Sequence, residues 1–204
     1  MLQFETFVGG VFETNCYLVQ APEGNILIDA PAGSTDWLRK INRRPDLLLV
    51  THGHVDHIDE AAKVKKSFSC RVGYHSDSVP LITDPDFFKR FGFFFEAEPV
   101  AADFLIDETP KLSLCGLNFQ VLHVPGHCPG SICFYLAEHH LLFGGDVLFA
   151  GGIGRTDLPG GDYETLIRGI HQKVLVLPDD TKVLSGHGPP TTIGEEKRTN
   201  PFLA

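Results

Sequence analysis

The apolar residues of this chain form short runs separated by glycine, proline and polar turns, and most runs have the length of a β-strand. Three such runs open the chain, at residues 2–8, 14–20 and 25–29, with Gly9-Gly10 and Pro22-Glu23-Gly24 between them. This punctuation suits antiparallel strands joined by turns. Further strands are expected at residues 47–50, 71–74, 111–115, 117–124, 131–137, 141–143 and 182–185.

Three segments have the apolar spacing of amphipathic helices. Ser34 or Thr35 is a suitable cap for a helix that ends at Asn42, and a second helix is expected over residues 58–68. A third spans residues 162–176, with its apolar side chains on one face. Helices that alternate with strands predict an α/β fold, and the opening antiparallel strands predict mixed β-sheets.

Length and charge narrow the class of protein. A chain of 204 residues is long enough for one domain with a sizeable core, so we expect a single domain over residues 1–204. The net charge is −9, and no basic patch stands out among the 17 Lys and Arg residues. This composition argues against a nucleic-acid partner.

Cysteine usage and hydropathy bear on the compartment. The five cysteines form no C-x-x-C pair, and their odd number leaves at least one unpaired, which favours a reducing compartment. The amino terminus has no basic segment followed by an apolar stretch, and no run of about 18 apolar residues occurs. The sequence therefore predicts a cytoplasmic protein that does not enter a membrane.

Residues 51–57, in the order T-H-G-H-V-D-H, directly follow a predicted strand and carry four side chains that can bind metals. His52 and His54 lie two residues apart at the strand end, so both point to the same side, while Asp56 and His57 follow where the chain turns into a helix. A single histidine is usually a loop or core residue, but three histidines and an aspartate at this spacing are typical of a metal site. One loop can thus serve two ions.

This loop resembles the signature of the metallo-β-lactamase superfamily, and four further blocks of that superfamily occur in order: P-G-H, G-G-D, G-R-T-D and G-H-G. The resemblance covers essentially the whole chain and implies a four-layer αββα sandwich. It implies seven metal ligands in two groups that share one carboxylate: His52, His54 and His127; Asp56, His57 and His187; and the bridging Asp146. The other histidines of strands, turns and helices are expected to be structural: His123, His139, His140 and His171.

Within the superfamily the chain is most similar to glyoxalase II, the hydroxyacylglutathione hydrolases, because E-E-K-R-T-N-P-F at residues 195–202 resembles the segment after their last ligand. Arg155 lies where that group has a basic contact to glutathione and is the candidate substrate-binding residue. Asp157 and Pro189 stand where the group has tyrosines, and the chain stops at Ala204 without the helical domain of glyoxalase II. The resemblance thus implies an open site that binds glutathione thioesters weakly.

We therefore expect a hydrolase with two divalent metal ions. Zinc is the first choice, and iron or manganese also suit imidazole and carboxylate ligands. A hydroxide between the ions would attack a small thioester such as S-lactoylglutathione, and Asp56 would orient this hydroxide as the catalytic carboxylate. A thiolate leaving group needs little protonation, so no separate general acid is required.

Other functions compete with this hypothesis. The chain also resembles persulfide dioxygenases, which hold a single iron; His52, His127 and Asp146 would then be its ligands. A metal-stabilised interaction module without activity is another hypothesis, but structural zinc sites are closed by four protein ligands, whereas each group here leaves an open position. Nothing in the sequence favours a lactonase or a β-lactamase.

Residues 84–98 form a phenylalanine-rich segment between acidic residues, with Phe87, Phe88, Phe91, Phe93, Phe94 and Phe95. A cover over the core is its simplest role, because aromatic side chains usually bury their area within their own fold. A lid over the active site is one alternative, and a homodimer contact through the segment Phe87–Phe95 is the other. The acidic flanks argue against insertion into a membrane.

Overall fold

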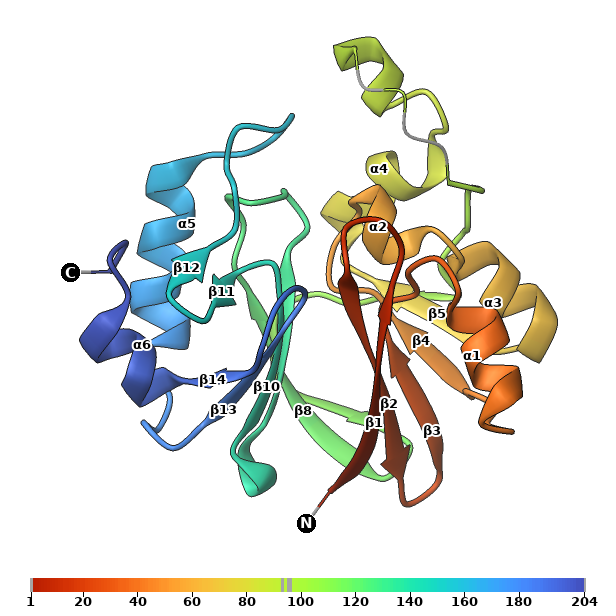
Figure 1. The fold of residues 1–204 in the computed structure, drawn as a ribbon, viewed down its shortest axis with the longest axis horizontal. Coiled ribbons are helices and arrows are strands. Elements are labelled where there is room, and N and C mark those ends of the chain that lie inside the picture. The colour runs from red at the N-terminus through yellow and green to blue at the C-terminus, as the bar shows by residue number, and fades with distance from the viewer. Residues whose placement is uncertain (1, 93, 95–96, 204) are drawn as a thin grey trace.

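The computed structural model describes residues 2–92, 94 and 97–203. Two six-stranded β-sheets face each other at the centre of the molecule, and helices cover the outer side of each sheet (Figure 1). This is a four-layer αββα sandwich with mixed sheets, so the predicted fold class is confirmed.

The first sheet contains the amino-terminal strands in the order of the chain. Its strands are β1 (Gln3–Gly9), β2 (Thr14–Ala21), β3 (Gly24–Ile28), β4 (Leu47–Leu49), β5 (Arg71–Tyr74) and β6 (Phe104–Leu105). β1, β2 and β3 pair antiparallel, as the turns between them predict. From β3 to β6 the strands are parallel, so β3 and β4 end at the same edge of the sheet.

The second sheet has the order β14-β13-β10-β9-β8-β7. Its strands are β7 (Thr109–Leu114), β8 (Leu117–His123), β9 (Ile132–Leu136), β10 (Leu141–Gly145), β13 (Lys182–Ser185) and β14 (Thr191–Thr192). β10 and β13 are parallel, and the other neighbours are antiparallel. A small separate pair consists of β11 (Leu148–Phe149) and β12 (Gly152–Ile153).

Six α-helices lie among the described residues: α1 (Ser34–Lys40), α2 (Val55–Ile58), α3 (Ala61–Phe68), α4 (Val79–Thr83), α5 (Tyr163–Gly169) and α6 (Ile193–Thr199). α1 and α3 cover the first sheet, while α5 and α6 cover the second (Figure 1). None of the helices within the described ranges combines the length and the apolar character needed to cross a bilayer.

The helix predicted over residues 58–68 is divided in two. α2 ends at Ile58 and α3 begins at Ala61, because the chain between them bonds to the end of β3. The amide of Ala30 donates to the carbonyl of His57, and the amide of Glu60 donates to the carbonyl of Ala30. The expected third helix is formed by α5 and a π-helical turn that ends at Val174.

The core consists of three apolar layers, one between the sheets and one beneath the helices on each side. Alternation along the strands assigns each side chain to its layer. On β2, Leu18 packs in the layer that contains Leu38 of α1, whereas Val19 packs between the sheets with Phe134 of β9. Both faces of the central strands are thus covered, which explains their continuous apolar runs.

Candidate metal centre

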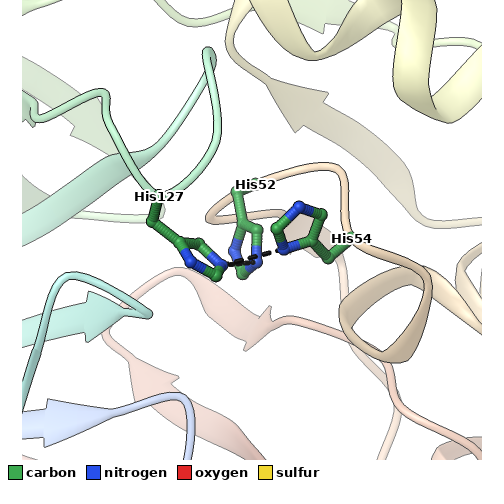
Figure 2. A group of neighbouring side chains, drawn as sticks. All are labelled: His52, His54 and His127. Carbon is green, nitrogen blue, oxygen red and sulfur yellow. Dashed lines mark hydrogen bonds between the residues drawn. The ribbon is translucent and has the colours of Figure 1, made fainter. Parts of the chain in front are cut away.

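Three histidines meet at the carboxyl ends of the strands. His52 and His54 follow β4, and His127 lies on the loop between β8 and β9 (Figure 2). The Nε2 atom of His127 lies 3.2 Å from Nε2 of His52 and 2.8 Å from Nδ1 of His54. All three side chains are buried. Their ring nitrogens converge on one point, in an arrangement that a tetrahedral metal ion can accept.

Hydrogen bonds behind the rings determine which nitrogen carries the proton. Nδ1 of His127 donates to the carbonyl oxygen of Arg155 at 2.7 Å. Nδ1 of His52 lies 3.1 Å from Oγ1 of Thr51, and this oxygen accepts from His52 because it donates its own proton to Asp29. The Nε2 atoms of His52 and His127 therefore direct lone pairs at each other, and a cation between them would remove this repulsion.

A second group lies beside the first and consists of Asp56 and His57 on α2 together with His187, which follows β13. Nδ1 of His57 donates to Asp29 at 2.7 Å, and Nδ1 of His187 donates to the carbonyl oxygen of Phe12 at 2.9 Å. Their Nε2 atoms face Oδ2 of Asp56, at 3.5 Å from His57 and 3.3 Å from His187. Two imidazole nitrogens and one carboxylate thus form a second set of atoms that could hold a metal ion.

Asp146 follows β10 and lies between the two groups. Its Oδ2 atom is 3.5 Å from Nε2 of His127 and 3.3 Å from Nε2 of His187, and its Oδ1 atom is 3.3 Å from Nε2 of His57. Oδ1 of Asp146 and Nε2 of His57 are buried without a hydrogen-bond partner. Such atoms are rare in folded proteins, and a cation between them removes their cost. The two clusters are therefore suited to binding two metal ions.

Burial and charge distinguish the two groups. Burial lowers the pKa of His54 to about 3 and also lowers the pKa of His52, so both rings stay neutral and keep a lone pair. Burial lowers the pKa of His187 as well, but contacts with Asp146 and Asp56 outweigh this effect and raise the pKa to about 10. In the chain alone the second group thus attracts positive charge, which a divalent ion supplies in place of a proton.

Two residues that orient the candidate ligands were not identified from the sequence. Asp29, directly after β3, accepts hydrogen bonds from the amide and Oγ1 of Thr51 and from His57, and its backbone is left-handed at φ 59°. Thr14 on β2 donates to Oδ2 of Asp56 at 2.7 Å. The position of Asp29 at a strand end is a signal that the ligands share, whereas a threonine within a strand carries no such signal.

His123 lies outside these two groups and belongs to another cluster, with His75 and Asp77. Its Nε2 atom donates to the carbonyl oxygen of Pro129 at 2.8 Å, and Nδ1 of His75 accepts from the amide of Asp77. The two rings stack with centroids 4.0 Å apart and planes 19° apart. Lone pairs in nearly parallel planes do not converge on one ion, so we do not interpret this cluster as a metal site.

A cavity of about 330 Å³ opens onto both groups of ligands. Its apolar lining consists of Phe12, Val55, Phe88 and Leu158. Arg155 also lines the cavity, but its guanidinium is paired with Asp157, with Nε 2.7 Å from Oδ1 and Nη2 2.8 Å from Oδ2. The candidate substrate-binding arginine thus lies at the site with its charge already partnered, and its role stays a prediction.

The phenylalanine-rich segment contributes to both the core and the cavity. Phe88 is buried among apolar neighbours and also lines the cavity. This residue therefore fits both predicted roles of the segment, the cover over the core and the lid over the site. Phe91 and Phe94 are exposed. Phe93 and Phe95 lie outside the described residues, and the contact between two copies of the chain stays a prediction.

Comparison with known proteins agrees with this geometry. The sequence model of the metallo-β-lactamase superfamily matches residues 9–187. The chain belongs to the metallo-β-lactamase superfamily. It is 43% identical over 203 residues to the hydroxyacylglutathione hydrolase GloC of Haemophilus influenzae, a match that covers 94% of this chain and 93% of the relative.

Two solved structures resemble the whole fold. The BLEG-1 B3 metallo-β-lactamase superposes with a TM-score of 0.89 at 37% identity, over 98% of this chain and 99% of the other. TTHA1623, solved in a di-iron-bound form, superposes with a TM-score of 0.87 at 36% identity, over 98% of this chain and 100% of the other.

Proposed function

We propose that the chain is a binuclear metal-dependent hydrolase that cleaves thioesters, with a reaction like that of glyoxalase II. The observation that carries the proposal is the position of Asp146, within 3.5 Å of histidines from both groups. The likeness to a hydroxyacylglutathione hydrolase supports thioester chemistry, and the di-iron-bound neighbour supports two ions. The proposed ligands are His52, His54 and His127 for one ion, Asp56, His57 and His187 for the other, and Asp146 for both.

Two divalent ions, when bound, would supply a water of lowered pKa and would polarise the substrate carbonyl. Asp56 would orient that water as a hydrogen-bond acceptor. Burial raises the pKa of Asp56, but contacts with His187 and His57 and the hydrogen bond from Thr14 hold it below the ordinary value. Asp56 is therefore ionised at neutral pH and held in one position, as an orienting carboxylate requires.

The substitution Asp56→Asn tests this role. We expect the variant to keep some of its metal, because six other proposed ligands remain, and to lose about 10²- to 10⁴-fold in kcat on thioesters, the usual range for a group that handles a proton. Asp59→Asn is the matched control, because Asp59 follows α2 directly and is exposed. Unchanged turnover in Asp56→Asn would refute the role of this carboxylate.

Metal analysis and two substrate classes separate the competing functions. We expect close to two ions per chain after purification without chelator, and hydrolysis of S-lactoylglutathione by the zinc-, iron- or manganese-loaded protein. A single ion that persists after supplementation, together with oxygen uptake on glutathione persulfide, would favour the one-iron dioxygenase. Inactivity on both substrate classes with two ions bound would favour an interaction module.

A further inference from the structure

The cavity above the metal centre has two different sides. Val55 at the start of α2 and Phe88 on the segment between α4 and β6 come from the half of the molecule that contains the first sheet. Arg155 and Leu158 come from the loop between β12 and α5, in the other half. Figure 1 shows these two segments rising on opposite sides of the same edge of the sandwich. A substrate in this cavity would lie between an apolar wall and a wall that carries a guanidinium.

Apolar neighbours hold the side chain of Phe88 in place. Its side chain is 8% exposed and packs on Leu81 and on Cys128, and its ring meets the ring of Phe87 edge-on with centroids 5.2 Å apart. Toward the proposed metal centre, the centroid of the Phe88 ring lies 5.8 Å from the centroid of the His54 ring. A side chain anchored in this way presents a preformed apolar surface next to the three histidines.

The opposite wall suits the leaving group of a thioester. Arg155 is the only Lys or Arg among the described residues that line the cavity. The ion pair of Arg155 and Asp157 is polar, so it suits the thiol half of the substrate better than an aliphatic acyl chain. With the thiol half toward Arg155, the acyl half extends toward Phe88. Because Asp157 balances the charge of the guanidinium, a thiol with several carboxylates gains little attraction at this wall.

On the basis of the proposed thioester hydrolysis, we propose that Phe88 determines acyl specificity and that the preferred substrates are thioesters of short, unsubstituted aliphatic acids. A cavity of about 330 Å³ is at the small end of the usual range of about 300–1,000 Å³, which limits the length of chain that fits. An acyl hydroxyl next to this apolar wall would lose its hydrogen bonds to water, so hydroxyacyl groups are the poorer substrates.

A series of S-acyl-N-acetylcysteamine thioesters from acetyl to octanoyl tests the proposal, because the thiol half is small, uncharged and constant. With the metal-loaded protein, kcat/KM should rise about two- to fourfold for each added methylene and then level off once the cavity is filled. Propionyl and lactoyl thioesters form a matched pair that differs by one hydroxyl, and the propionyl compound should be the better substrate.

Variants of Phe88 test whether this side chain causes the dependence of kcat/KM on acyl length. Phe88→Ala should flatten the dependence on acyl length, and Phe88→Trp should move the optimum to shorter chains. Phe91→Ala is the control, because Phe91 lies on the same 3₁₀ turn but is 55% exposed and does not line the cavity. Should Phe88→Ala fail to fold, Phe88→Trp and the unmodified protein still give the result.

The outcomes separate this inference from the proposed function. A flat acyl series, a preference for lactoyl over propionyl, or an unchanged series in the Phe88 variants would overturn the inference while thioester hydrolysis stands. If the metal-loaded protein hydrolysed no thioester at all, S-lactoylglutathione included, the proposed function itself would be overturned.

Discussion

Asp29→Asn tests how far the metal centre depends on a carboxylate that lies behind the proposed ligands. Asp29 is 2% exposed and accepts three hydrogen bonds of 2.7–2.8 Å. Oδ1 accepts from the amide of Thr51, while Oδ2 accepts from Oγ1 of Thr51 and from Nδ1 of His57. The substitution preserves the shape of the side chain, removes its charge and replaces one acceptor oxygen by a donor.

The expected loss follows from this geometry. Whichever way the new amide group turns, it directs hydrogens at a group that also donates, so at least one of the three hydrogen bonds is lost. A buried hydrogen bond to a charged group contributes about 1.5–3 kcal/mol, so we expect the free energy of unfolding to fall by about 2–3 kcal/mol. The ring of His57 is also held less firmly, and changes of this kind reduce metal affinity about 10- to 100-fold.

Urea unfolding of the metal-free protein measures the first effect, and zinc titration against a chelator of known affinity measures the second. Asp36→Asn is the matched control, because the Asp36 side chain is 75% exposed and pairs with Arg39 at the surface. If Asp29→Asn unfolded at the wild-type urea concentration and bound both ions with wild-type affinity, the orienting role of Asp29 would be wrong.

Two further substitutions examine the cavity wall and the crowded centre. Asp157→Asn removes the carboxylate that pairs with Arg155, so KM for S-lactoylglutathione should fall while KM for an uncharged thioester stays constant. If the variant and the wild type had the same KM for each of the two substrates, the ion pair would have only a structural role. Gly186→Ala should reduce metal content below two ions, because the added Cβ would collide with Oδ1 of Asp146. Gly144→Ala is its control, since the nearest side-chain atom to a Cβ there is 3.4 Å away, and full metal content in Gly186→Ala would contradict the expected collision.

The ten strands longer than two residues among the described residues could be predicted from the sequence because their signal is local. The two-residue strands β6, β11, β12 and β14 and the helix ends depend on distant groups and were not predicted. Ser34 and Thr35 have the side chains of capping residues, yet α1 begins after Gly33 and neither hydroxyl caps it. The amide of Thr35 donates instead to Oε2 of Glu60, at 2.7 Å. Glu60 is 25 positions further along the chain, so no local pattern could have identified this cap.

The same distinction applies to the site. Each proposed ligand belongs to a short block that resembles the superfamily pattern, so the resemblance could name the ligands from the sequence, and the structure brings these residues together. The cavity wall is different, because Phe12, Phe88 and Leu158 come from three separate segments whose distance from the metal centre depends on the whole fold. The sequence pattern marks the phenylalanine-rich segment, but its spacing does not indicate which of the rings lines the cavity.

The backbone of the cavity wall and its side chains have separate tasks. The carbonyl oxygen of Phe12 accepts from His187 and that of Arg155 accepts from His127, so the main chain of both segments orients proposed ligands. The side chains of the same two residues line the cavity. Because an orienting carbonyl is present whatever the side chain, residues here can be exchanged with little direct effect on the histidine rings. Substrate preference can therefore change at these positions while the proposed metal ligands stay the same, so specificity has to be argued from the wall of the cavity.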